Sequence, residues 1–128
     1  MSEPLVYVGR YKIPSGKLEA FKKFEKEIAE YVDANEPRIL AYITYLNDDG
    51  TEATGIQIHA DSQSMETHLD VIGPKMAQAM DFIEDVRIEL YGLPAEGLRQ
   101  RLTQMAEMTG VSLKFNQPHA GFSRLQPS

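Results

Sequence analysis

Apolar residues along the first half of the chain follow two different spacings, and each spacing predicts one kind of secondary structure. Residues 5–12 (LVYVGRYK) are rich in β-branched and aromatic side chains, which favours a strand. From residue 17 to about residue 35, apolar side chains recur every three or four positions, which predicts a long amphipathic helix. Residues 38–46 and 51–60 are strand-like again and flank the turn sequence NDDG, so we expect a β-hairpin.

Residues 61–92 carry the pattern of a second helix followed by a fourth strand. Asp61 and Ser62 offer side-chain oxygens for a helix N-terminus, and an apolar face follows them. Gly73 and Pro74 interrupt that face, so we predict a helix that is kinked or split there. Residues 84–91 alternate strictly between apolar and polar side chains, which is typical of a strand with one buried face.

The order of these elements is strand, helix, strand, strand, helix, strand, which is the ferredoxin-like βαββαβ pattern of an α+β antiparallel sheet. We therefore predict a ferredoxin-like core over residues 1–92 and a C-terminal extension over residues 93–128. Within the extension, the pattern predicts a helix that ends at Gly110 and a short strand after it. We expect this helix-strand unit to pack on the core or on a partner subunit.

A sheet with helices on one side leaves its other face, here called the open face, without cover. If the apolar residues of the third and fourth strands face the helices, the polar ones between them form the open face. That reading assigns to it Gln57, His59, Arg87, Glu89 and Tyr91. Such a mixed surface predicts a homodimer that forms through the open face. The alternative is a monomer in which the C-terminal extension covers the same face.

The amino-acid composition excludes several classes of partner and one class of chemistry. The 13 basic and 19 acidic residues give a net charge of −6 without a basic face, so a nucleic-acid partner is not expected. The chain has no cysteine, which rules out thiol chemistry. No apolar run approaches the length that spans a bilayer, so no membrane partner is predicted and a cytoplasmic location is the default expectation.

Two stretches resemble the antibiotic biosynthesis monooxygenase-like family. In residues 55–69 (GIQIHADSQSMETHL), a strand ends in Asp61, a helix carries His68 seven residues later, and Pro74 follows, as in that family. Residues 11–21 (YKIPSGKLEAF) resemble its passage from the first strand into a long helix. The resemblance covers about residues 5–91. It implies a dimeric α+β barrel and a small monooxygenase that works without a cofactor on aromatic or polyketide-like compounds.

His68 is the first candidate for a catalytic residue. It shares a helix face with Met65, Leu69 and Ile72, so we expect its imidazole to lie between helix and sheet, where its pKa could move. A base in that position could deprotonate a phenol or an enol, and the resulting anion would itself reduce dioxygen. The alternative is a structural histidine that hydrogen-bonds to the backbone.

His59, Arg87 and Tyr91 are candidates for binding a polar part of the substrate, although side chains on neighbouring strands often only pair with one another. Metal binding is not predicted, because no carboxylate accompanies His59 or His68 at ligand spacing. Glycine-rich phosphate loops are absent from the sequence, so no nucleotide cofactor is implied.

Two functions remain open at this point. The first is a small cofactor-independent monooxygenase that acts on a small apolar or aromatic ligand of undetermined identity. The second is a non-catalytic dimeric module for small-ligand binding or stress response, in which both histidines are structural. A haem-degrading relative is a third reading, which a haem titration would test.

Overall fold

A computed structural model describes residues 4–125. Within this range the chain forms five strands and three helices. In chain order these are β1 (Leu5–Lys12), α1 (Leu18–Asn35), β2 (Ile39–Leu46), β3 (Glu52–His59), α2 (Ser62–Ala79), β4 (Glu84–Tyr91), α3 (Glu96–Thr109) and β5 (Ser112–Asn116). The first four strands and two helices appear in the order that the sequence predicts.

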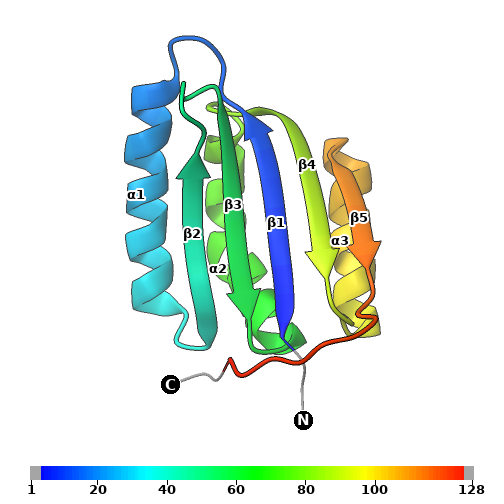
Figure 1. Cartoon of the computed structure of the whole chain (residues 1–128). Helices are drawn as coiled ribbons and strands as arrows, with labels where there is room; N and C mark the ends of the chain where they lie inside the picture. Colours follow the sequence, from blue (N-terminus) through cyan, green and yellow to red (C-terminus); the bar gives the residue numbers. More distant parts are fainter. Residues whose placement is uncertain (1–3, 126–128) are drawn as a thin grey trace.

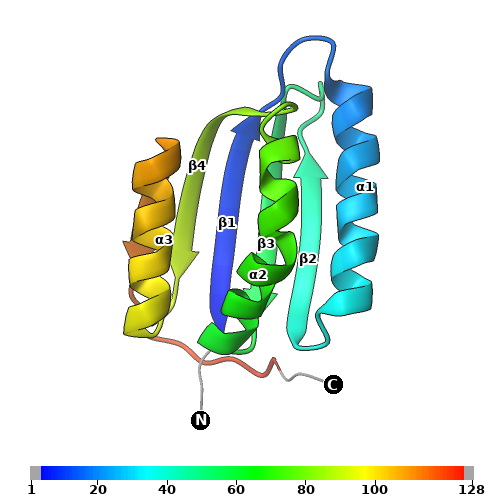
Figure 2. The same ribbon diagram turned by 180° about the vertical axis from the view of Figure 1, so that it is seen from behind.

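The strands form one sheet in the order β2-β3-β1-β4-β5. Neighbouring strands are antiparallel except for β4 and β5, which are parallel. All three helices cover the same side of this sheet (Figure 1 and Figure 2). The order of the first four strands is the ferredoxin-like arrangement, so the predicted α+β fold is confirmed.

Helix α2 is not split at Pro74, one of the two predicted forms, because it continues through this residue as one helix. A proline removes one backbone hydrogen bond from a helix but does not stop it when packing holds both halves. Here Met65 and Ile72 are buried before Pro74, and Lys75 and Ala79 are half-buried after it. The start of α2 is as predicted, since the Asp61 carboxylate accepts a hydrogen bond from the Ser64 amide at 2.9 Å.

The segment after Gly92 extends the same sheet and the same helical layer. Leu98 and Leu102 of α3 are buried against Leu5, Met65 and Leu90. Strand β5 then pairs with the free edge of β4. Because α3 lies on the helical side and β5 lies at an edge, residues 96–116 do not cover the open face (Figure 1).

The register of β3 corrects the predicted composition of the open face. His59 pairs with Leu5, which is buried in the core, so His59 and Gln57 point toward the helices. The prediction placed both on the open face and was wrong. It assumed that apolar side chains always face the core, whereas this polar pair is buried because its groups hydrogen-bond to each other and to α2.

The open face is consequently more apolar than the sequence pattern indicated. Pairing across the strands brings together Val6, Val8, Ile43, Ile56 and Ile58 on it. The same registers place Arg87, Glu89 and Tyr91 of β4 beside them.

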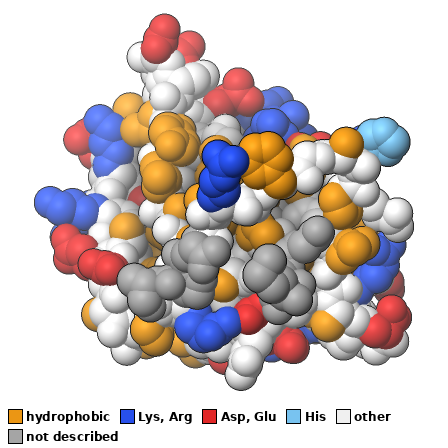
Figure 3. Space-filling model, turned by 60° about the horizontal axis from the view of Figure 1, so that its bottom comes forward, with side chains coloured by type: hydrophobic (Ala, Val, Ile, Leu, Met, Phe, Trp, Pro, Cys, Tyr) orange, Lys and Arg blue, Asp and Glu red, His pale blue; other side chains and the backbone are white. Residues whose placement is uncertain are grey.

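Charged side chains of both signs are interspersed with hydrophobic ones over the lower end of the molecule (Figure 3). In the described range, no helix combines the length and the apolar character that crossing a membrane requires.

Candidate active site

A cavity of about 540 Å³ lies between the sheet and the helices. This volume is within the usual range of small-molecule sites. Most of its wall is apolar and comes from all three helices, including Phe24, Ile28, Leu69, Ile72 and Leu102. Side chains with polar groups also border it: Tyr7, Tyr11, Glu25, Tyr42, Gln57, His68, Lys75, Arg101 and Thr109. An apolar chamber with a few converging polar groups is typical of a site for a compact organic ligand.

His68 borders this cavity and is held by a buried carboxylate. Its Nδ1 lies 2.9 Å and 3.0 Å from the two carboxylate oxygens of Glu36, and the two side chains are only 5% and 2% exposed. A carboxylate can only accept hydrogen bonds, so Nδ1 carries the donated proton. In the neutral ring, Nε2 is then the basic nitrogen. Among residues 4–125, no group hydrogen-bonds to Nε2, which is therefore free to meet a ligand.

His59 lies next to His68, and the centroids of the two rings are 5.6 Å apart. Both of its nitrogens are occupied: Nε2 donates to Oε1 of Gln57 and Nδ1 accepts from the Ser64 hydroxyl, each at 2.9 Å. Burial, and then the neighbouring His68, lower the pKa of His59 to about 3. His59 is thus a neutral, fully buried group that packs against His68.

Glu25 and three tyrosines form the other polar part of the cavity wall. The Tyr42 hydroxyl donates to Oε2 of Glu25 at 3.3 Å, and burial raises the pKa of Glu25. Burial also raises the pKa of Tyr7, Tyr11 and Tyr42. The tyrosines therefore stay protonated at neutral pH and can serve as hydrogen-bond donors.

Two glycines make room for the Tyr11 side chain. Gly9 and Gly55 face each other in the register of β1 and β3. A Cβ atom built at Gly9 would lie 2.4 Å from the Tyr11 hydroxyl oxygen, and one at Gly55 would lie 3.2 Å from it. Tyr11 consequently lies against the bare backbone of the sheet at the floor of the cavity, a close approach that only glycine permits.

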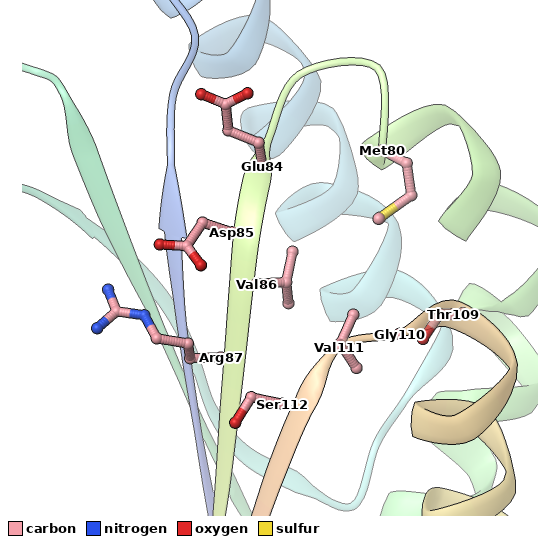
Figure 4. A pocket seen from close by; sticks show the side chains of 9 residues that line it. All are labelled: Met80, Glu84, Asp85, Val86, Arg87, Thr109, Gly110, Val111 and Ser112. Carbon is pink, nitrogen blue, oxygen red and sulfur yellow. The ribbon is translucent and has the colours of Figure 1, made fainter.

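Arg87 and Tyr91 lie on the open face, across the sheet from this cavity. Arg87 forms a 3.5 Å ion pair with Glu52 of β3. It also borders a second, smaller pocket of about 250 Å³ between the start of β4 and the turn from α3 to β5 (Figure 4). In Figure 4, Arg87 and Asp85 extend from the side of β4 opposite to Val86, which borders the large cavity. The structure thus brings His59 to His68 but separates Arg87 and Tyr91 from it.

Sequence reasoning did not identify Glu36, Glu25 or the three tyrosines as site residues. Glu36 follows the last residue of α1 and is 32 residues from His68, so no spacing rule connects the two. The sequence does contain a pattern that indicates Tyr7 and Tyr11. Side chains alternate along a strand, so both tyrosines lie on the same face as the buried Leu5. Over residues 4–125, no three His, Cys, Asp or Glu side chains converge as a metal-binding group.

Comparison with protein-family models gives no match, and comparison with curated proteins gives none either. Solved structures do match. MupZ from Pseudomonas fluorescens superposes with a TM-score of 0.77 at 24% identity, over 96% of each chain. A candidate antibiotic biosynthesis monooxygenase from Caulobacter crescentus matches at 0.63 and 21% identity, over 73% of this chain and 91% of its own. SnoaB, a cofactor-independent oxygenase from Streptomyces nogalater, matches at 0.61 and 15% identity, over 74% and 95%.

The three matches differ in how much of this chain they cover. The match with MupZ covers 96% of this chain. It therefore extends into the helix and the strand that follow Gly92. The two other proteins match about three quarters of the chain. The resemblance found in the sequence is thus confirmed at the level of architecture: this chain has the fold of the antibiotic biosynthesis monooxygenase-like proteins.

Proposed function

We propose that this protein is a small oxygenase that needs no cofactor and acts on a compact aromatic or polyketide-like molecule bound in the 540 Å³ cavity. The observation that carries the proposal is the buried Glu36–His68 pair, which leaves Nε2 of His68 at the cavity wall without a partner from residues 4–125. The fold shared with SnoaB, a cofactor-independent oxygenase, supports the same class of reaction.

The reaction begins with proton transfer to His68. Nε2 removes a proton from an acidic C–H or phenolic O–H group, and the Glu36 carboxylate stabilises the imidazolium that forms. The substrate anion then passes an electron to dioxygen, and a carbon–oxygen bond forms. For a methylene group, loss of water from the resulting hydroperoxide leaves a carbonyl, so one oxygen atom enters the product and the other leaves as water.

The remaining wall of the cavity assists this chemistry. Negative charge develops on the substrate oxygen as the proton leaves, and the hydroxyls of Tyr7 and Tyr11 are donors that can stabilise it. The apolar wall keeps bulk water away from the anion, so that the anion meets dioxygen rather than a proton from solvent.

We further propose that the protein works as a homodimer joined through the open face. The support is the apolar strip of Val6, Val8, Ile43, Ile56 and Ile58, of which Ile43 is 45% exposed in the single chain. Sheet-on-sheet packing of two copies would remove this strip from water.

Oxygen uptake with a panel of anthrones and hydroquinones tests the proposed reaction. We expect uptake with at least one substrate, and a loss of about 100-fold or more in His68→Ala, the usual effect of removing a general base. His119→Ala is the matched control, because His119 is exposed in the C-terminal segment. Uptake that survives in His68→Ala would remove His68 from the reaction. Tight binding of these compounds without any uptake would favour the non-catalytic ligand-binding module.

A further inference from the structure

Glu25 and His68 are both neighbours of the Tyr42 side chain. The Tyr42 hydroxyl hydrogen-bonds to Glu25 at 3.3 Å, and the Tyr42 ring centroid is 5.7 Å from that of His68. Glu25 projects from α1, Tyr42 from β2 and His68 from α2, and all three border the same cavity. A compact ligand lying against Tyr42 in this cavity would therefore be near both ionisable groups.

The proposed reaction needs a proton donor as well as a base. In the first half, His68 takes a proton from the methylene carbon and returns it to the peroxide anion after dioxygen has added. In the second half, neutral His68 takes the remaining proton from that carbon while the O–O bond breaks and the carbonyl forms. The departing hydroxide must then receive a proton from another group, because His68 is acting as the base at that moment.

We propose that Glu25 is the second catalytic residue of this site and donates that proton to the departing oxygen. The inference rests on the proposed oxygenase function and adds a residue to it. Water is the second product, and turnover closes when the imidazolium of His68 returns its proton to the Glu25 carboxylate. In sum, a methylene group and dioxygen become a carbonyl and water, with both protein groups restored.

The surroundings of Glu25 suit a donor. Burial raises its pKa, against the opposing effect of hydrogen bonds from Tyr42 and Thr44 on β2. The charge of Glu25 also acts on Tyr7 and Tyr11 of β1, and Lys75 and Arg101 border the same cavity. Within residues 4–125, Glu25 forms no ion pair that would hold it in the charged form. Its carboxyl group is thereby disposed to keep a proton until a stronger base appears.

Anthrone allows the two half-reactions to be measured separately. Without dioxygen, exchange of its methylene protons for solvent deuterium reports proton removal by His68. With dioxygen, formation of the carbonyl product reports the complete reaction. The test variant is Glu25→Gln, which keeps the shape and the acceptor for Tyr42 but cannot donate as an acid. Glu27→Gln, an exposed position on the same helix, is the matched control.

We expect Glu25→Gln to exchange deuterium within about twofold of the wild type, while product formation falls about 100-fold and a hydroperoxide accumulates. His68→Ala should lose both activities. Wild-type product formation in Glu25→Gln would overturn the assignment of Glu25. Equal loss of exchange and product formation in Glu25→Gln would overturn it too, because the residue would then be needed for binding or folding. If the wild type shows neither activity, the proposed oxygenase function itself fails, and the role of Glu25 fails with it.

Discussion

The Glu36 carboxylate, directly after the last residue of α1, accepts a hydrogen bond from Nδ1 of His68, in the middle of α2, at 2.9 Å. The contact links two helices whose intervening chain forms the β2–β3 hairpin. Both side chains are almost completely buried, so the pair is shielded from solvent. Such burial strengthens the electrostatic coupling and fixes the orientation of the imidazole.

Replacement of Glu36 by glutamine should therefore damage catalysis more than stability. The amide oxygen can still accept the Nδ1 proton, but the negative charge that stabilises the imidazolium is lost. We expect kcat/KM for anthrone oxidation to fall by about 100-fold or more. Glu30→Gln, an exposed position on α1, is the control and should have no effect. Unchanged kinetics in Glu36→Gln would show that the carboxylate only packs the helices together.

His59 should make the protein less stable in acid. Its pKa is lowered from 6.5 to about 3 in the folded chain, first by burial and then by His68. Above about pH 6.5 neither state binds the proton. Between about pH 6.5 and pH 3, the unfolded chain binds a proton that the folded chain does not, so stability falls by up to about 1.4 kcal/mol per pH unit.

Urea unfolding of the wild type and of His59→Gln across this pH range measures the effect. The variant should show a shallower dependence of the unfolding free energy on pH, whatever its absolute stability. His119→Gln, at an exposed position, should keep the wild-type slope. Equal slopes for the wild type and His59→Gln would mean that His59 accepts a proton in the folded state.

The two glycines below Tyr11 should tolerate alanine to different degrees. At Gly9 the new methyl group would be 2.4 Å from the Tyr11 hydroxyl oxygen, which forces the side chain to move, whereas at Gly55 the gap is 3.2 Å. Overpacking of this kind costs about 1–3 kcal/mol, so Gly9→Ala should lower the melting temperature more than Gly55→Ala does. Combining Gly9→Ala with Tyr11→Phe should recover part of the loss, since the closest atom is gone. Additive effects of the two changes would contradict the predicted contact.

Ile56 lies at the centre of the apolar strip, paired with Val8 on one side and Ile43 on the other. We expect Ile56→Glu to leave the helical content unchanged, because the side chain points away from the core. It should convert the proposed dimer to a monomer, because a charge would be buried between the two sheets without a partner. Sedimentation velocity provides the measurement, with Met108→Glu as a control at an exposed position on α3. A dimer that survives in Ile56→Glu would place the interface elsewhere.

Local sequence patterns were sufficient to predict the elements and their order. Strands β1 and β4 begin and end at the predicted residues, and the Asp61 cap and the end of α3 at Gly110 are also as expected. These features depend on periodicity, capping and turn residues, which act between positions close in the chain. His68 was found the same way, because helical spacing alone places it on the buried face of α2.

Tertiary structure decided which strand faces are buried and what surrounds His68. Alternation predicts that Gln57 and His59 share a face, but which face it is depends on the pairing of His59 with Leu5. Likewise, the Glu36–His68 pair exists only because α1 and α2 pack side by side on the sheet. The physical reason is common to both: burying a polar group is favourable only when partners are in place, and here those partners come from distant parts of the chain.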